Sequence, residues 1–307
     1  MINKRIAVIL VNWNSFDVTN DCILSLKNVR SDNFSIIVVD NGSVDHSGTR
    51  LRDLHPEIIL LESPVNTGFT GGNNIGFRYS LAHGYEYSIM LNNDTFVEAD
   101  FLDILCRYMD EHPDVGIVQP RIFYHHDRNL IWNGGSYFNR FLGYTYTKGE
   151  AKPSSEKYNF EKEVDWVTGC AFFVRNDIIR KTGLLAENMF IYSEDVDLSF
   201  RIRKLGYKLM YLPSSVIYHI SGMSNTSRTK GEEGFVSPGA HYLNQRNRLW
   251  ILKKYIPWYF APSAIIFNFF YISLVIGYFA LRKRFKKLRA VLRAVRDGIK
   301  GSIIYNQ

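Results

Sequence analysis

Short apolar runs alternate with amphipathic stretches over residues 5–95. The runs typical of buried parallel strands lie at residues 6–11, 36–40, 58–61 and 87–91. An amphipathic stretch at 17–27 follows the first run, and a second helix is expected from Asn74 to His83, ended by Gly84. This βαβ pattern predicts an α/β domain with a doubly wound, mostly parallel sheet.

Regular elements return after a central region, 120–165, that we assign only to antiparallel strands or loops. The second regular block consists of a strand at 166–174, a helix beginning near Glu194 and closed by Gly206, and short strands at 208–212 and 216–219. Beyond it, residues 221–238 are rich in Ser, Thr and Gly, and we interpret them as a mobile loop that closes over a bound ligand.

The C-terminal part of the chain is apolar and then basic. No charged residue occurs from 255 to 281, and a helix of that length can cross the ~30 Å hydrocarbon core of a bilayer. The tail from 282 to 300 holds nine basic residues and one acidic residue, which accounts for the whole net charge of +7. The positive charge therefore favours an anionic lipid surface, and not nucleic acid, as the partner.

Basic residues flank both ends of the apolar run, because Lys253 and Lys254 precede it. Both ends are thus expected on the cytosolic side, with the run forming an in-plane or re-entrant helix pair on the membrane. A buried pair of core helices in a soluble protein is the alternative. The first apolar run is too short for a signal peptide, and three widely spaced cysteines predict neither disulfides nor a cysteine zinc site. A reducing, cytosolic setting follows.

Polar residues follow the predicted strands, where ligands bind in parallel sheets. Asn92, Asn93 and Asp94 come after the fourth run and present the oxygen ligands that a hard divalent cation prefers; an ordinary turn is the alternative. His219 ends a β-rich run and can supply an imidazole to the same metal, or can be a packed core histidine. Asp40 ends the second run and can accept hydrogen bonds from a base or ribose, or can form an Asx turn.

Two further segments carry candidate chemistry. The glycines of residues 66–76 permit close approach of the backbone to a ligand, but they follow the third run and so are not a dinucleotide fingerprint. Glu194, Asp195 and Asp197 stand in the first turn of a helix, where the dipole alone favours acids; one of them can instead face a cleft and take a proton from an alcohol. Residues 245–248 carry two arginines that can grip a diphosphate, or that simply precede a membrane segment.

In this order the segments resemble the family-2 glycosyltransferases with the GT-A fold, particularly the bacterial rhamnosyltransferase-like branch, over residues 5–250. The resemblance implies donor contacts from Asn12, Asn14, Asp40, Asn73, Asn74, Asn93, Trp166 and Arg248. It implies Mg²⁺ or Mn²⁺ held by Asp94, His219 and Asn92, where Asn92 replaces an acid of the family's DxD motif. It makes Asp195 the catalytic base and Glu194 the residue that positions the acceptor, with Asp197 holding the helix turn.

The same resemblance suggests an inverting transfer of rhamnose from dTDP-rhamnose to a lipid-linked saccharide at the cytoplasmic face of a bacterial membrane, in cell-surface polysaccharide assembly. Residues 1–240 would form the GT-A catalytic domain, and residues 241–307 the peripheral or monotopic membrane part. Leu249 stands where processive relatives have tryptophan, so polymerisation is not predicted. The sugar pocket is assigned walls from Trp132, Trp166 and Phe172.

Three alternatives stay open. The donor can be a UDP-hexose or UDP-N-acetylhexosamine, because pocket shape decides the sugar. A non-catalytic scaffold that binds a nucleotide sugar would have no reason to keep acids at both Asp94 and Asp195. A sugar-1-phosphate nucleotidyltransferase would need a glycine-rich loop after the first strand, and residues 12–15 contain no glycine.

Overall fold

The computed structural model describes residues 5–221, 226–231 and 233–305. Four parallel strands form one half of the central sheet, in the order β3-β2-β1-β4. They are β1 (Ile6–Asn12), β2 (Phe34–Asn41), β3 (Ile59–Ser63) and β4 (Tyr87–Leu91). The four predicted strands and the doubly wound sheet are thereby confirmed.

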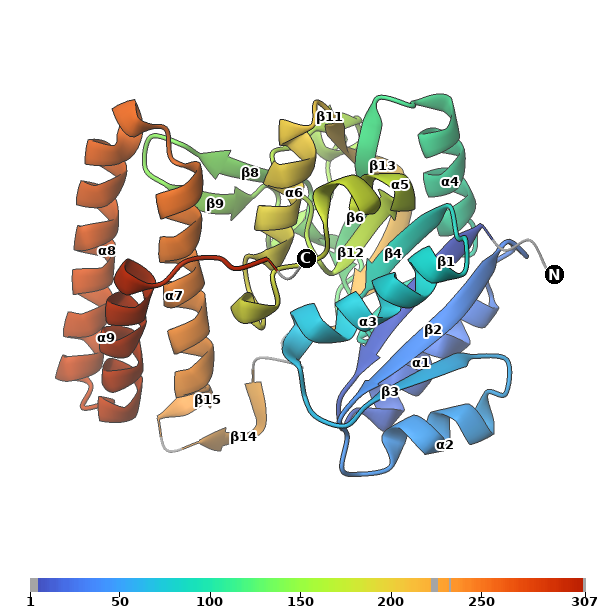
Figure 1. The fold of residues 1–307 in the computed structure, drawn as a ribbon, viewed down its shortest axis with the longest axis horizontal. Coiled ribbons are helices and arrows are strands. Elements are labelled where there is room, and N and C mark those ends of the chain that lie inside the picture. Colours follow the sequence, from blue (N-terminus) through green and yellow to red (C-terminus); the bar gives the residue numbers. More distant parts are fainter. Residues whose placement is uncertain (1–4, 222–225, 232, 306–307) are drawn as a thin grey trace.

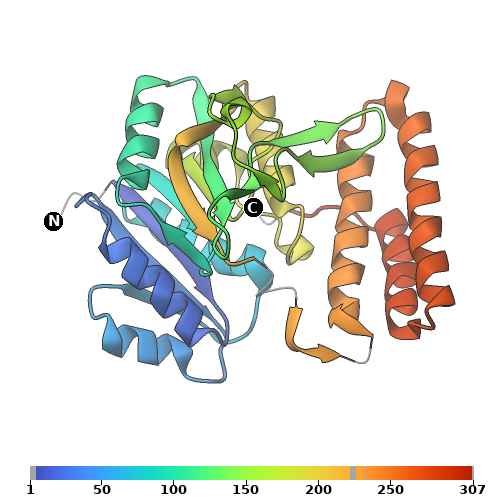
Figure 2. The same ribbon diagram turned by 180° about the vertical axis from the view of Figure 1, so that it is seen from behind.

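Helices cover both faces of this sheet, because alternate residues of each strand point to opposite sides. Ile6, Val8 and Leu10 of β1 pack under the helices of one face, and Ala7 and Ile9 pack under those of the other. The first face carries α1 (Phe16–Lys27), α2 (Ser47–Leu54) and α4 (Phe101–Glu111), and the second carries α3 (Gly68–Ala82), α5 (Asn176–Thr182) and α6 (Glu194–Lys204). Figures 1 and 2 show these two layers from opposite sides.

Helix α3 begins at Gly68, six residues before the predicted start at Asn74, so the predicted boundary was wrong. Two of the glycines that suggested a ligand loop, Gly72 and Gly76, are instead turned toward the sheet. A Cβ at Gly72 would lie 2.7 Å from Val11, and one at Gly76 would collide with Ile9. The glycines therefore let α3 lie close against β1, and this packing overrides their low helix propensity.

The other half of the sheet is mixed. Antiparallel β12 (Ala171–Arg175) joins β4 to β6 (Val115–Tyr124), which pairs in parallel with β13 (Lys208–His219). The two short strands predicted at 208–212 and 216–219 are one strand with a register shift between Leu212 and Val216. The remaining strands of the central sheet are β5 (Thr95–Val97), β7 (Leu130–Asn133), β10 (Lys152–Pro153) and β11 (Lys162–Glu163). Strands β8 (Ser136–Asn139) and β9 (Tyr144–Thr147) pair with each other in a separate two-stranded sheet, and η1 (Glu156–Tyr158) and η2 (Glu187–Met189) are short 3₁₀ helices.

Three C-terminal helices stand beside the sheet: α7 (Pro238–Tyr255), α8 (Ala261–Leu281), preceded by the turn η3 (Trp258–Phe260), and α9 (Phe285–Lys300) (Figure 1). By length and composition, Trp258–Leu281 is able to cross a membrane, and 22% of its apolar window is buried. A core helix of a soluble protein is mostly buried, so the alternative of a buried core pair is not supported.

Helix α7 contacts both the domain built on the central sheet and the other C-terminal helices. It packs along α9, and its residues Trp250 and Ile251 share an apolar cluster with Val196 of α6. The predicted boundary between residues 240 and 241 therefore falls inside a helix that contacts both sides. In the predicted mobile loop, β14 (Thr226–Gly231) and β15 (Gly234–Val236) form a hairpin, while residues 222–225 and 232 lie outside the described residues.

Candidate active site

A pocket of about 320 Å³ opens where the ends of β4, β12 and β13 meet the start of α6. Six of the residues predicted from sequence line it: Asn92, Asp94, Trp166, Glu194, Asp195 and His219. Trp132, predicted as a wall of the sugar pocket, also lines it, whereas Phe172 is fully buried in the core, so that assignment was wrong. Phe172 lies in β12, whose side chains are enclosed between neighbouring strands and helices.

One corner of the pocket brings together the residues predicted to bind a metal. Antiparallel pairing of β13 with β5 sets His219 beside Thr95, which brings its Nε2 to 3.0 Å from Asp94 Oδ1. The Asn92 side-chain amide lies 3.3 Å from the same nitrogen. Both Asp94 and His219 are buried, and the indole of Trp132 packs edge-on against the imidazole at 4.6 Å between ring centroids.

These donors fit a hard divalent cation. No group of three or more His, Cys, Asp or Glu side chains suited to a metal exists among the described residues, so the protein offers one carboxylate, one imidazole and one amide. Mg²⁺ and Mn²⁺ sites that act on phosphates commonly have few protein ligands, because substrate phosphates and water complete the coordination. The pocket leaves room for both beside Asp94.

Asp195 lies at the start of α6, and two backbone amides hold its carboxylate. Its Oδ2 accepts a hydrogen bond of 2.8 Å from the Gly169 amide, and its Oδ1 accepts one of 2.8 Å from Val196. Burial raises the pKa of Asp195 to about 6, although both hydrogen bonds act in the opposite direction. The carboxylate is thus fixed in direction and is basic enough to take a proton near neutral pH.

Glu194 lies next to this carboxylate and is only 4% exposed, and its Oε2 has no hydrogen-bond partner in the described part of the chain. Burial first, and then the charge of Asp195, raise the pKa of Glu194 well above its usual value. Two neighbouring carboxyl groups with separated pKa values give one acid and one base. Burial favours the protonated form of Glu194, whose Oε2 is left to bond a ligand.

A second polar cluster lies at the ends of β1 and β2. The Asn12 amide donates to Asp40 at 2.9 Å and to Ser47 at 2.7 Å, while Ser43 also bonds Asp40. Asn14 accepts a bond from the Val44 amide and shapes the same turn. Asn12 is fully buried, so it orients Asp40 and does not itself face solvent.

Asn93 connects the two polar clusters. Its amide donates to Thr19 Oγ1 at 2.8 Å, and that hydroxyl donates to Asn12 at 2.9 Å. Asn73 and Asn74 are not brought to the pocket. Asn73 bonds the Phe69 carbonyl one turn earlier in α3, and Asn74 bonds the backbone of Leu185 through both its oxygen and its nitrogen. Their place inside α3, and not in a loop, explains this.

Arg248 also lies away from the pocket. Its Nε donates to Asn268 at 2.7 Å and its guanidinium stacks on Tyr271, so it joins α7 to α8. Trp166 does line the pocket, with its indole nitrogen fixed by the Tyr137 carbonyl at 3.0 Å. Sequence reasoning missed Asn244, which lines the pocket from α7, and nothing in the helical pattern around it marks it.

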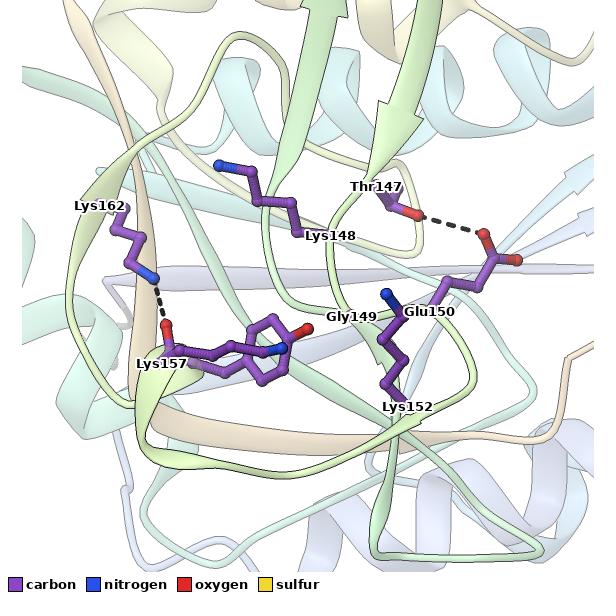
Figure 3. Close-up of a pocket in the computed structure, with 8 residues that line it drawn as sticks. Thr147, Lys148, Gly149, Glu150, Lys152, Lys157 and Lys162 are labelled. Carbon is purple, nitrogen blue, oxygen red and sulfur yellow. Dashed lines mark hydrogen bonds between the residues drawn. The ribbon is translucent and has the colours of Figure 1, made fainter.

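A larger cavity of about 420 Å³ lies elsewhere, at the turn after β9 (Figure 3). Four lysines line it: Lys148, Lys152, Lys157 and Lys162. Lys162 bonds the Lys157 carbonyl, and Lys148 stacks over Tyr137. None of the residues predicted to carry chemistry lines this cavity, so the smaller pocket is the candidate active site.

Comparison with known proteins agrees with this geometry. The chain is 23% identical over 307 residues to the dTDP-rhamnosyl transferase RfbF of Shigella flexneri, covering 98% of this chain and 97% of that protein. It is 25% identical over 251 residues to the N-acetylglucosaminyl-diphospho-decaprenol L-rhamnosyltransferase of Mycobacterium tuberculosis, covering 74% and 78%. The mannosyltransferase PcManGT of Pyrobaculum calidifontis, solved with GDP-Man and Mn²⁺, superposes with a TM-score of 0.54 at 14% identity, covering 96% of this chain and 87% of that one.

The structural likeness establishes a GT-A fold for this chain, as the resemblance in sequence predicted. The sequence model of glycosyl transferase family 2 matches residues 7–182, which is more than half of the chain. The matched span contains the Asp40 cluster together with Asn92 and Asp94, and the match to the Shigella flexneri relative extends beyond this span. The chain therefore belongs to glycosyl transferase family 2, in its rhamnosyltransferase-like branch.

Proposed function

We propose that this protein is an inverting, metal-dependent glycosyltransferase that moves rhamnose from dTDP-rhamnose to a lipid-linked saccharide. The observation that carries the proposal is the placement of a carboxylate suited to act as base and a pair of candidate metal ligands in one pocket, with Asp195 at one wall and Asp94 with His219 at another. A non-catalytic scaffold would not need a pocket carboxylate with a pKa raised to about 6.

Asp195 takes the proton of an acceptor hydroxyl as that oxygen forms a bond to the anomeric carbon of the sugar. The bond from this carbon to the diphosphate breaks on the opposite face, so the configuration inverts. Glu194, which carries a proton, hydrogen-bonds an acceptor oxygen and orients it toward Asp195. When bound at Asp94 and His219, Mg²⁺ or Mn²⁺ supplies positive charge to the departing diphosphate.

The Asp40 cluster is proposed to hold the nucleoside end of the donor, because it lies at the ends of β1 and β2 and is linked through Asn93 to the metal corner. The names of the two rhamnosyltransferase relatives support dTDP-rhamnose as the donor. A UDP-hexose or UDP-N-acetylhexosamine is the second choice. Trp132 and Trp166 would contact the sugar.

A lipid-linked acceptor is supported by the decaprenol-linked substrate in the name of the mycobacterial relative. The exposed apolar side chains of α8 and the basic residues of α9 suit a membrane surface with anionic lipids, approached from the cytoplasm. We therefore propose a peripheral or monotopic enzyme at the cytoplasmic face of the membrane.

The test is release of free nucleoside diphosphate from a panel of donors, with and without Mn²⁺, in detergent with a lipid-linked acceptor. Wild type is compared with Asp195→Asn and Asp94→Ala, and Asp177→Asn, an exposed acid of α5, serves as the control. Turnover of dTDP-rhamnose lost only in the two pocket variants supports the proposal. If no donor is turned over and nucleotide binding is unchanged in Asp94→Ala, the result would instead favour the non-catalytic scaffold.

A further inference from the structure

The loop that leads into the two carboxyl residues is held in an unusual backbone conformation. Phe190, Tyr192 and Ser193 have φ values of 66°, 75° and 65°. Each is a non-glycine residue in the left-handed region, which costs of the order of a kcal/mol or more and persists only when neighbouring groups impose it. The loop ends where α6 begins, one residue before Glu194, so its path sets the direction of both acids.

A single side chain of α7 bonds three carbonyls of this loop. The Asn247 amide nitrogen lies 2.9 Å from the carbonyl oxygen of Met189, 2.9 Å from that of Ile191 and 2.8 Å from that of Tyr192. Asn247 is fully buried, so no water can replace these bonds. The amide has two N–H groups, and three converging carbonyls use all of its donor capacity.

Arg246 fixes which way this amide points. Its Nε donates to Asn247 Oδ1 at 2.9 Å, which turns the nitrogen toward the loop. Its NH2 group also donates to the Asn188 carbonyl at 2.8 Å. The Phe190 carbonyl, which Asn247 does not reach, accepts from the Thr70 amide of α3 at 3.1 Å. The strained loop is therefore held between α3 and α7.

A second contact ties α7 to the same helix start. Asp197 is fully buried and accepts bonds from Lys254 at 2.9 Å, from Tyr255 at 2.6 Å and from Tyr305 of the C-terminal tail at 2.6 Å. Arg201, one turn further along α6, also donates to Asp197, from its Nε to Oδ2 at 2.9 Å. The helical C-terminal part is thus bonded on both sides of the pair Glu194 and Asp195.

We propose that Asn247 is a positioning residue that holds the strained loop 190–193 and so aims Asp195 and Glu194 into the pocket. This inference rests on the proposed function, because it takes Asp195 as the base. It gives the C-terminal helices a role in the chemistry that is separate from any contact with a membrane. A misplacement of a reacting group by about 1 Å can lower a rate about 100-fold.

The chain contains a matched control. Asn268 of α8 is also buried, and its amide also bonds three carbonyls, those of Leu142 and Gly143 in the β8–β9 turn and that of Ala264 one turn earlier in α8. Asn247→Leu and Asn268→Leu each replace a buried amide by an apolar side chain of the same shape. Both variants should therefore lose similar stability to urea, while only the first disturbs the loop before α6.

The expected result is a kcat about 100-fold lower in Asn247→Leu, with the KM for donor and the Kd for nucleoside diphosphate unchanged, and a kcat near wild type in Asn268→Leu. Hydrogen exchange measured by mass spectrometry should accelerate over residues 190–193 only in Asn247→Leu. If that variant does not fold, Arg246→Met tests the same contact, because it frees the amide but keeps the asparagine.

A kcat of wild-type size in Asn247→Leu, or an equal loss of kcat in Asn268→Leu, overturns the inference. If the wild-type protein turns over no donor, the proposed function has failed. Hydrogen exchange over residues 190–193 then tests by itself whether Asn247 holds the loop. Unchanged exchange over residues 190–193 in Asn247→Leu then overturns it, and faster exchange confined to that segment supports it.

Discussion

Replacing the proposed base should make the protein more stable while it abolishes turnover. Asp195→Asn exchanges a partly buried carboxylate for a neutral side chain of the same size. Burial raises the pKa of Asp195 from an ordinary 3.8 to about 6. Since one pKa unit corresponds to about 1.4 kcal/mol, the ionised group costs the folded state about 3 kcal/mol at neutral pH.

Asp195→Asn removes this cost, but the variant also loses a hydrogen bond. The carboxylate accepts bonds from the amides of Gly169 and Val196, and asparagine has a single acceptor oxygen for these two donors. One lost hydrogen bond costs about 1 kcal/mol. The net stabilisation by Asp195→Asn is therefore about 2 kcal/mol above pH 7.

The pH dependence follows from the direction of the shift. An acid whose pKa is higher in the folded than in the unfolded protein adds stability at low pH, and this contribution is lost as the pH rises through about 6. Asp195→Asn has no ionisable group at this position, so its stability does not fall in this pH range for that reason. Its advantage should be absent near pH 4, grow as the pH rises to about 6 and stay constant above pH 7, as measured by urea unfolding followed by tryptophan fluorescence.

Asp110 provides a control of opposite sign. A hydrogen bond from Arg5 holds the pKa of Asp110 below its usual value, so its contribution is present above the unfolded pKa and disappears as the pH falls through the folded one. Asp110→Asn should therefore lower the free energy of unfolding at neutral pH. An Asp195→Asn variant that is no more stable than wild type at pH 7.5, or whose gain does not depend on pH, would refute the reasoning.

Three further substitutions test other parts of the molecule. Trp132→Phe removes an indole edge from His219 and should raise the Mn²⁺ concentration for half-maximal turnover about tenfold, measured by metal titration; an unchanged curve contradicts a supporting role. Gly76→Ala places a methyl group against Ile9 and should cost about 1–3 kcal/mol of unfolding free energy, with no cost if α3 is not packed on β1. Phe269→Asp charges the exposed face of α8 and should abolish sedimentation with anionic vesicles while turnover of a water-soluble acceptor persists; full sedimentation contradicts membrane docking through α8.

The parallel half of the sheet could be predicted because its strands are enclosed on both faces and so read as apolar runs. The Asp94 corner could be anticipated because ligands bind beyond the carboxyl ends of parallel strands, although the same polar run could also have been an ordinary turn. The start of α3 could not, because glycine serves a ligand loop and close helix packing equally well. Gly72 and Gly76 meet Val11 and Ile9, and that contact is absent from any local pattern.

The four parallel strands, the acids in the first turn of α6 and the apolar run of α8 could be predicted from the amino-acid sequence, because each depends on neighbours a few residues away. Which polar residues meet depends on the tertiary structure. Asp94 and His219 are joined through the pairing of β13 with β5, and Asn247 reaches the loop before Asp195 because α7 packs across it. Hydrogen bonds between residues far apart in the chain depend on this packing, which leaves no periodic trace in the sequence.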